Sequence, residues 1–232
     1  MIKLENVGFR YEDMVMNFDL QVAKGELVGI IGPSGAGKST LLSLIAGFDL
    51  PISGRISIAG ADMAGVAPDQ RPVSMIFQDH NSFAHLDAWT NVALGISPDL
   101  KLDPQHRARV DEALARVGLL DFKARKPTEL SGGERQRIAI ARALVRDKPV
   151  LLLDEPFTAL GPALRREMLD LIRGIQKERK LTVLMITHQP EDAKYAASRI
   201  AFVQNGRISH VLPTKQFFAA SAPAEISAYL RG

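Results

Sequence analysis

The sequence predicts an α/β fold in which a mostly parallel sheet is interrupted by a helical insertion. Strand candidates alternate with helical patterns over most of the 232 residues, and residues 27–31 are apolar on both faces, as a strand between two layers requires. Residues 79–147, in contrast, hold several helical patterns and no strong strand. Alternating strands and helices favour a mostly parallel sheet. The length of 232 residues fits a single domain with an insertion. Its core is residues 1–78 and 148–232, with the helical segment inserted.

The individual elements follow in chain order. Alternating hydrophobicity favours strands at the start of the chain, and a glycine-rich loop and an apolar helix come after the buried strand. Asp103 before Pro104 predicts a helix start, because Asp caps a first turn and Pro is tolerated at the first helical position. The strand candidates are residues 3–7, 18–22, 27–31, 55–58, 73–77, 150–153, 182–186 and 200–204, and the other helix candidates are residues 38–46, 162–178 and the C-terminal tail.

Composition excludes several classes of protein. The 29 basic and 26 acidic side chains leave a formal charge of +3, which is too small to indicate a nucleic-acid partner. The absence of cysteine excludes disulfides and Cys-based zinc sites. The chain begins without a signal-peptide pattern, and no apolar run approaches the roughly 20 residues of a membrane helix. We therefore expect any membrane role to depend on a partner.

A complete phosphate-binding loop follows the buried strand. It matches the pattern G-x-x-x-x-G-K-[ST] and consists of Gly32, Pro33, Ser34, Gly35, Ala36, Gly37, Lys38, Ser39 and Thr40. Glycines let backbone N–H groups turn toward phosphate oxygens, and the next helix points its positive end at them. We expect Lys38 to bind the β- and γ-phosphates of ATP and Ser39 to bind Mg²⁺. A chance glycine-rich turn is the alternative, which the flanking strand and helix disfavour.

Two carboxylates end an apolar strand candidate. Residues 150–153 are followed by Asp154 and Glu155. Successive strand residues point to opposite sides, so the two side chains are expected to have different roles. Asp154 is the candidate second Mg²⁺ ligand, and Glu155 is the candidate group that polarises the attacking water. Solvated charges at a strand end are the alternative, and the phosphate loop makes the catalytic interpretation specific.

A helix start with two glycines lies in the helical segment. Ser131, Gly132, Gly133 and Glu134 form this serine–glycine helix start. Ser131 and Glu134 have the spacing of a capping box, which explains them without any ligand. Adjacent glycines weaken a first turn but let an anion approach bare N–H groups. Since one ATP already has its loop, this surface is predicted to bind the ATP of a second copy.

The sequence resembles the ATP-binding subunits of ABC transporters over nearly its whole length. The resemblance is carried by three motifs that occur in the family's order: the phosphate loop, the LSGGERQ segment at residues 130–136 and the acidic pair. The resemblance implies a P-loop NTPase core with a mostly parallel sheet, an antiparallel β subdomain and an inserted α-helical subdomain. It also implies a head-to-tail homodimer that holds two ATP molecules with Mg²⁺. Each nucleotide would lie between the phosphate loop of one copy and the serine–glycine helix start of the other.

The resemblance assigns further residues one by one. Tyr11 is similar to the aromatic that stacks on adenine, although an edge tyrosine is the plain alternative. Gln78 resembles the glutamine that senses Mg²⁺ and the γ-phosphate, and His188 resembles the histidine that holds the γ-phosphate and the attacking water. A solvated glutamine and an unremarkable histidine are the alternatives. One departure is Gly161, where the family has an aspartate that couples the two sites of the dimer.

The resemblance also implies partners. A transmembrane permease would contact residues 79–89, which include Phe83, His85, Leu86 and Trp89, although Trp89 fits the core of the helical segment equally well. Residues 71–78 and 95–102 resemble the ATPase of bacterial thiamine importers, and residues 71–78 also resemble importers of iron, sulfate and polyamines. Such a subunit would lie at the cytoplasmic face of the inner membrane and serve a periplasmic substrate-binding protein indirectly. A soluble ATPase of DNA repair or translation is disfavoured, because long coiled-coil arms and a second cassette are absent.

Overall fold

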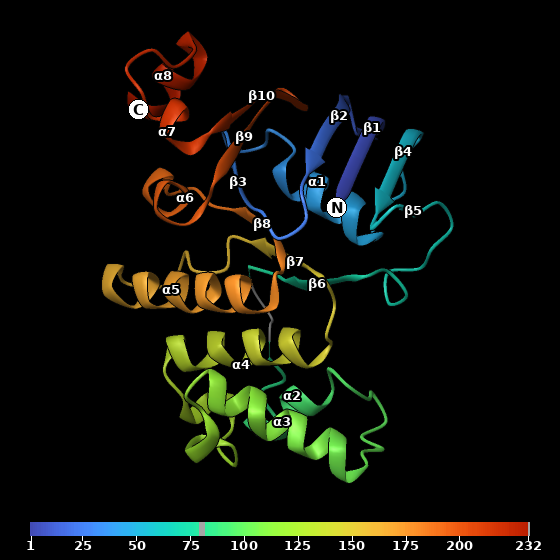
Figure 1. Ribbon diagram of the computed structural model, residues 1–232, viewed down its shortest axis with the longest axis vertical. Coiled ribbons are helices and arrows are strands. Elements are labelled where there is room, and N and C mark those ends of the chain that lie inside the picture. Colours follow the sequence, from blue (N-terminus) through green and yellow to red (C-terminus); the bar gives the residue numbers. More distant parts are fainter. Residues whose placement is uncertain (79–81, 232) are drawn as a thin grey trace.

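The computed structural model describes residues 1–78 and 82–231, and the strands within them form one ten-stranded sheet (Figure 1). The strand order is β5-β4-β1-β2-β10-β9-β3-β8-β7-β6. The strands are β1 (Ile2–Tyr11), β2 (Met14–Val22), β3 (Leu27–Ile31), β4 (Ser53–Ile58), β5 (Ala61–Asp62), β6 (Val73–Ile76), β7 (Val150–Asp154), β8 (Thr182–Ile186), β9 (Arg199–Gln204) and β10 (Arg207–Pro213). The helices are α1 (Lys38–Ala46), α2 (Ala88–Ala93), α3 (Pro104–Arg116), α4 (Gly132–Val145), α5 (Pro162–Arg179), α6 (Pro190–Ala196), α7 (Thr214–Phe217) and α8 (Ala224–Arg231).

One half of the sheet is parallel. Strands β9, β3, β8, β7 and β6 pair in parallel, and all five residues of β3 are buried, as expected for a central strand. Because the carboxyl ends of parallel strands meet at one edge, the residues that follow β3, β7 and β8 lie together there. The other half is built by antiparallel pairing of β1 with β2 and β4, and of β10 with β9. The predicted mixed α/β fold with a largely parallel sheet is confirmed.

Buried side chains of the described residues form two clusters, one on each face of the sheet. The first packs α1 against β1, β2 and the inner face of the parallel strands. The second joins the opposite face to the helices from α2 to α8. Within residues 82–147 the chain forms helices and no strand, and Figure 1 shows α4 between α5 and the pair α2 and α3.

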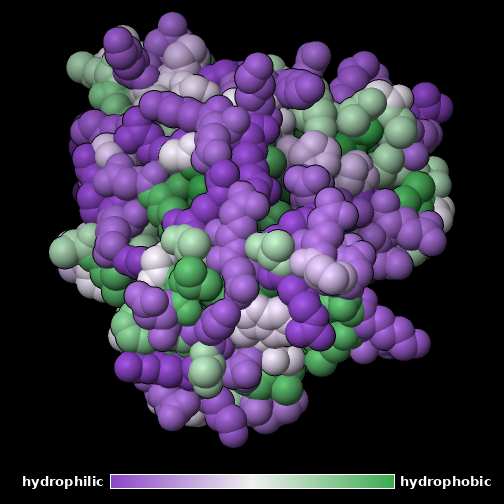
Figure 2. All heavy atoms as spheres, turned by 60° about the horizontal axis from the view of Figure 1, so that its bottom comes forward, coloured by the Kyte–Doolittle hydropathy of each residue, from purple (hydrophilic) through white to green (hydrophobic). Residues whose placement is uncertain are grey.

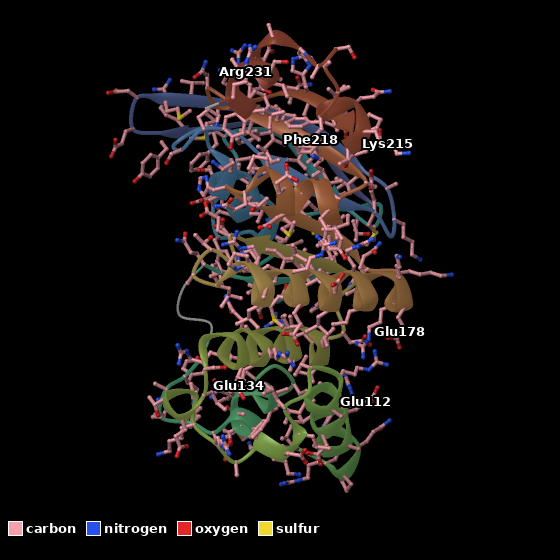
Figure 3. All side chains as sticks on the ribbon, turned by 90° about the vertical axis from the view of Figure 1, so that its left-hand side faces the viewer. Glu112, Glu134, Glu178, Lys215, Phe218 and Arg231 are labelled. Atoms are coloured by element: carbon pink, nitrogen blue, oxygen red, sulfur yellow. The ribbon has the colours of Figure 1, made fainter. Side chains whose placement is uncertain are left out.

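An ion pair joins the helical segment to the core at one end. Both terminal nitrogens of Arg116 on α3 bond the Glu178 carboxylate on α5, at 2.8 and 2.7 Å, and Figure 3 shows Glu178 and Glu112 at the same end of the stacked helices. The serine–glycine helix start, marked there by Glu134, lies at the opposite end of α4. One end of the helical stack is therefore joined to the core by an ion pair, and the other end carries the serine–glycine helix start.

The structure adds elements for which no prediction was made. Strand β10 is only partly buried; it pairs with β9 along its length and with β2 at one position. Its sequence does not show the strict alternation that predicts a half-buried strand. Helix α6 has only seven residues and starts at Pro190, which is too short for a periodic signal. Strand β5 has two residues.

The outer surface carries no extended apolar region in the view of Figure 2, which shows mostly hydrophilic residues with small separate hydrophobic patches. Over residues 1–78 and 82–231, none of the helices combines the length and the hydrophobicity that crossing a membrane would require.

Candidate nucleotide-binding site

The phosphate loop connects β3 to α1 and is shaped by two close approaches. A Cβ atom on Gly32 would lie 1.9 Å from the carbonyl oxygen of Val203 on β9, so only glycine fits there. Gly37, the N-cap of α1, has φ +100°, and a Cβ atom on it would lie 3.0 Å from the sulfur of Met16. Pro33, Ser34 and Gly35 are exposed at the tip of the loop. Since Gly37 has no side chain to cap α1, the first N–H groups of that helix remain available to a ligand in the loop.

Lys38 is the first residue of α1, and its amine is folded across the loop. Its Nζ donates to the carbonyl oxygens of Gly32 at 2.9 Å and Pro33 at 2.7 Å. The side chain is buried, and this burial lowers the pKa of Lys38 while the nearby Glu155 and Asp154 carboxylates oppose the shift. The lysine thus lies between the loop backbone and the acidic pair.

Ser39 and Asp154 meet although 115 residues separate them in the chain. The Ser39 hydroxyl donates to Asp154 Oδ1 at 3.1 Å, which joins the start of α1 to the end of β7. Burial raises the pKa of Asp154, and the hydrogen bond from Ser39 partly offsets that shift. A partly buried carboxylate beside a hydroxyl is an oxygen pair suited to a hard cation.

Glu155 and His188 form a second pair at the same edge of the sheet. His188 Nε2 lies 2.5 Å from Glu155 Oε1, and the Glu155 backbone N–H donates to the carbonyl oxygen of Ile186 on β8 at 3.2 Å. Strand β7 ends at Asp154, and Glu155 takes a left-handed conformation with φ +48°. This turn sends the two adjacent carboxylates to different partners, Asp154 to Ser39 and Glu155 to His188.

The turn that carries His188 is fixed by residues for which no prediction was made. The Thr187 hydroxyl donates to Asp192 Oδ2 at 3.2 Å and accepts from the Gln189 N–H at 3.0 Å. Desolvation by burial raises the pKa of Asp192. The available signal was local, because a threonine that bonds a backbone N–H two residues later is a recognised turn motif.

A cleft of about 520 Å³ places Gln78 and Glu155 beside the serine–glycine helix start. Its lining residues are Gln78, Ser82, Gly132, Arg135, Gln136, Glu155, Pro156, Thr158, Ala159 and Leu160. Gln78 is exposed and follows β6 by two residues. Gln78 and Glu155 therefore face the same cleft. The residues of the phosphate loop are not among those that line it.

The serine–glycine helix start is capped by its own side chains. Ser131 Oγ accepts from the Glu134 N–H at 3.3 Å, and Glu134 Oε2 accepts from the Ser131 N–H at 2.7 Å, which completes the predicted capping box. The two glycines differ. A Cβ atom on Gly133 would lie 2.5 Å from Leu164, so packing on α5 explains that glycine. Among residues 1–78 and 82–231, no atom would come closer than 3.7 Å to a Cβ atom on Gly132, so packing against them does not require glycine there.

The remaining predicted residues lie apart from this cluster. Tyr11 ends β1 with 61% of its surface exposed, on the β1–β2 hairpin whose Met16 contacts Gly37. Residues 79–81 of the predicted permease contact lie outside the described residues. Trp89 is partly buried in the helical segment and donates its ring N–H to Asp111 at 3.0 Å, which supports the core alternative for that residue. Gly161 is the N-cap of α5, without the side-chain cap that an aspartate could supply.

Comparisons with known proteins identify the family. A sequence model described as "ABC transporter" matches residues 15–158. The thiamine import ATP-binding protein ThiQ of Mesorhizobium japonicum is 50% identical over 229 residues, covering 99% of this chain and 90% of that protein. The ThiQ protein of Aliivibrio fischeri is 48% identical over 231 residues, covering 100% of this chain and 99% of the relative.

Solved structures share the fold. The ATP-binding cassette MJ0796, as a dimer in a post-hydrolysis state bound to ADP and Pi, superposes with a TM-score of 0.80 at 31% identity, covering 92% of this chain and 99% of that one. The protein cbiO1 of Clostridium perfringens, part of the ABC transporter complex cbiONQ, superposes with a TM-score of 0.86 at 30% identity, covering 94% and 90%. The chain therefore belongs to the ABC transporter family, as one of its ATP-binding subunits.

Proposed function

We propose that this chain binds and hydrolyses ATP to energise an importer of thiamine and its phosphates. One observation carries the ATPase part of the proposal: Ser39, Asp154, Glu155 and His188 form two contacting pairs where β3, β7 and β8 end. The names of the relatives, which are about half identical over nearly the full chain, support the thiamine part.

The residues present fit a bound Mg²⁺ ion together with ATP. Among residues 1–78 and 82–231, no group of three or more His, Cys, Asp or Glu side chains could hold a metal by itself. A cation at Ser39 and Asp154 would therefore complete its ligands with phosphate oxygens, as Mg²⁺ does in nucleotide sites, and Gln78 is the third candidate ligand. When bound, Mg²⁺ neutralises charge on those oxygens.

The chain's own groups would then act in sequence. Lys38 would leave the Gly32 and Pro33 carbonyls for the phosphates, and the amides that begin α1 would bind phosphate oxygens. The remaining loop residues, Ser34, Gly35, Ala36 and Thr40, would surround them, and Tyr11 would stack on adenine. Glu155 would accept a hydrogen bond from the attacking water. His188, which contacts the Glu155 carboxylate, would orient that water.

Gly132 supports a site shared between two copies. Packing among the described residues does not require a glycine at that position, so we infer that Ser131, Gly132, Gly133 and Glu134 receive a nucleotide from a second subunit. Residues 79–147 would act as the moving helical subdomain that brings this helix start to the partner's phosphate loop. Closure of the pair would exclude water and complete the site.

A groove beside Gln78 fits the permease. It has a volume of about 230 Å³, and two exposed aromatic rings at its rim, Phe48 and Phe77, lie 5.7 Å apart between centroids. Arg142 on α4 and Arg146, the residue directly after α4, also line it. Aromatic and arginine side chains are enriched at interfaces. Through this contact the subunit would sit at the cytoplasmic face of the inner membrane, with a periplasmic binding protein acting indirectly.

The catalytic proposal is tested with Glu155→Gln, which keeps the shape of the side chain and removes its charge. We expect this variant to bind Mg-ATP and accumulate as a closed dimer with turnover reduced at least a hundredfold. The matched control is Glu191→Gln, whose exposed carboxylate pairs with Lys194 at 3.4 Å. Normal steady-state turnover of Glu155→Gln would contradict the role of Glu155.

The substrate is tested by reconstitution with the permease in vesicles. Thiamine-loaded binding protein should stimulate ATP hydrolysis several-fold. Stimulation by an iron, sulfate or polyamine binding protein, and none by the thiamine one, would favour the alternative importers suggested by residues 71–78.

A further inference from the structure

The loop before α2, residues 83–87, is held by one buried side chain of that helix, Asn91. The Asn91 amide nitrogen donates to three carbonyl oxygens of the loop, those of Phe83, Leu86 and Asp87, at 2.9–3.0 Å. Its Oδ1 atom accepts from the Phe83 N–H at 2.8 Å. Asn91 is fully buried, so water cannot replace these bonds if the side chain is removed. The backbone of the loop is therefore fixed to α2.

Arg142 reaches the same asparagine from α4. Its Nε atom donates to the backbone carbonyl oxygen of Asn91 at 2.8 Å, and a terminal nitrogen donates to Asn91 Oδ1 at 2.5 Å. Oδ1 thus uses both of its acceptor positions, one toward the loop and one toward α4. The turn after α2 packs closely on α4 as well, because a Cβ atom on Gly95 would lie 2.7 Å from the carbonyl oxygen of Arg142. The loop, α2 and the end of α4 therefore form one packed unit, at the bottom of Figure 1.

The ring of Phe83 lies at the surface of this unit. The guanidinium carbon of Arg142 is 5.1 Å from the ring centroid, which is within the range of a cation–π contact. Phe83 nevertheless has 48% of its surface exposed, and Ala84 and His85 are exposed beside it. Aromatic side chains on a fixed backbone are frequent anchors of protein interfaces. The loop thus presents a ring that the chain itself covers only in part.

The two ends of α4 carry different functions in the proposed subunit. Ser131 caps the first turn, which belongs to the serine–glycine helix start, and Arg142 lies in the last turn. A helix transmits a displacement of one end to the other as a rigid element. A loop that was free to move relative to α4 would lose that displacement before it reached a partner.

We propose that Asn91 is a positioning residue that, together with Arg142, fixes Phe83 to α4. The ring then moves with the serine–glycine helix start and carries that movement to an apolar part of the permease. This role rests on the proposed permease contact and on the proposed site shared between two copies.

The test is Asn91→Ala in the full chain, with Val110→Ala as the control. Val110 is fully buried on α3, so its truncation also weakens the helical segment but leaves the bonds of the loop in place. In Asn91→Ala, hydrogen exchange of the peptide that contains Phe83 should become faster. Half-maximal binding to vesicles that carry the permease should need about tenfold more subunit, the range for truncating an interface anchor. Basal hydrolysis of ATP by the subunit alone should stay nearly unchanged, because the bonds of Asn91 described above involve no residue of the nucleotide site.

A second variant covers the case in which Asn91→Ala does not fold. Arg142→Lys keeps the charge of α4, but an ammonium group cannot reproduce the forked pair of bonds that arginine makes to Asn91. It should show the same direction of change in exchange and in binding to the vesicles.

Three results would overturn the inference. The first is wild-type exchange at Phe83 in the variant that folds, which would mean that these bonds do not hold the loop. The second is faster exchange with wild-type binding to the permease vesicles. The third is an equal loss of binding in Val110→Ala, which would indicate a general loss of stability. Failure of the wild-type subunit to hydrolyse ATP or to bind the permease vesicles would instead refute the proposed function, so the two failures are distinguishable.

Discussion

Two helices of this chain start with glycines, but their first turns are built differently. Helix α1 begins after Gly37, which has a left-handed backbone and no capping side chain. Helix α4 begins after Ser131, which has an extended backbone and is closed by a capping box with Glu134. Gly32 and Gly37 of the phosphate loop have atoms of the same chain within 3.0 Å of the position of a Cβ atom, whereas Gly132 has none closer than 3.7 Å among the described residues. Packing among these residues does not account for Gly132, which the proposed contact with a second copy would explain.

The largest expected effect is at the loop itself, in Gly32→Ala. The new Cβ atom would overlap the backbone oxygen of Val203, which cannot rotate away. We expect a loss of more than about 3 kcal/mol of stability, above the usual range for an overpacked core. Urea denaturation followed by circular dichroism measures it.

The control for that variant is Gly35→Ala. Gly35 also has a positive φ, +73°, but no atom lies within 4 Å of the position of its Cβ atom. It should therefore cost only about 1–2 kcal/mol of backbone strain. Equal losses in the two variants would show that the contact with Val203 is unimportant.

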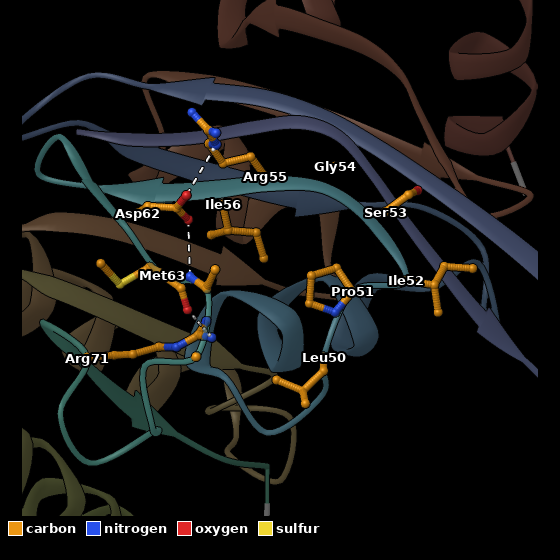
Figure 4. Close-up of a pocket in the computed structure, with 12 residues that line it drawn as sticks. Leu50, Pro51, Ile52, Ser53, Gly54, Arg55, Ile56, Asp62, Met63 and Arg71 are labelled. Atoms are coloured by element: carbon orange, nitrogen blue, oxygen red, sulfur yellow. Dashed lines mark hydrogen bonds and ion pairs between the residues drawn. The ribbon is translucent and has the colours of Figure 1, made fainter.

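The far ends of the two helices sharpen the comparison. The last-turn carbonyls of Leu44 and Ile45 on α1 accept from Arg71, which is 1% exposed and also donates to the carbonyls of Val66 and Met63. Figure 4 shows the Arg71 side chain directed at Met63, with Arg55 nearer the rim of the same pocket. The corresponding bonds on α4 come from partly exposed arginines, Arg109 and Arg179.

Replacing Arg71 with Met should cost about 3 kcal/mol, because four carbonyls lose their donor and three of these bonds are buried. Arg55→Met is the matched control, since Arg55 makes a surface ion pair with Asp62 at 3.2 Å and should cost less than about 1 kcal/mol. Denaturation midpoints of the two variants decide the matter. A loss below about 1 kcal/mol for Arg71→Met would show that these bonds do not hold the end of α1.

The sequence was informative where a local pattern carries the structure. The buried strand at residues 27–31 and the helix at residues 38–46 were predicted with their observed bounds. The phosphate-loop pattern marks where that strand ends and where that helix begins. Strand β10 and helix α6 were not predicted, since neither has enough residues in one periodic pattern.

Long-range contacts were the other limit. The meeting of Ser39 with Asp154 could be expected from the carboxyl-end rule for parallel strands. The contact of Tyr229 with Phe202 could not, because it joins the C-terminal helix to β9 with no motif to indicate it. Likewise, the sequence alone could not separate Gly132 from Gly133, because the difference depends on where Leu164 packs.

Gly132→Ala tests the comparison most directly. Because the space for a Cβ atom exists and alanine favours a helix, stability should stay equal or rise by up to about 1 kcal/mol. Turnover should nevertheless fall at least tenfold, which corresponds to about 1.4 kcal/mol in activation free energy, while binding of ATP to one subunit changes little. Steady-state hydrolysis and nucleotide titration separate the two effects.

The control for Gly132→Ala lies on α5. Gly174 is a helical glycine with no atom of the described residues within 4 Å of its Cβ position, so Gly174→Ala should give a similar gain in stability with unchanged turnover. If Gly132→Ala hydrolysed ATP at the wild-type rate, the inference that this glycine serves a second subunit would be wrong.

The smallest expected effect concerns the capping box. Ser131→Ala removes the cap of α4 and should cost about 1 kcal/mol.

The hydroxyl of Ser131, and then its backbone N–H, hold the pKa of Glu134 below its ordinary value of 4.5. A lowered pKa means that the stability from this carboxylate is present above pH 4.5 and is lost as the pH falls through the lower folded-state value. The difference in denaturation midpoint between wild type and Glu134→Ala should therefore be constant near neutral pH and shrink in acid. A difference that stays constant into acid would mean that the charge of Glu134 adds nothing to the cap, and that α4 starts there through the Ser131 side chain alone.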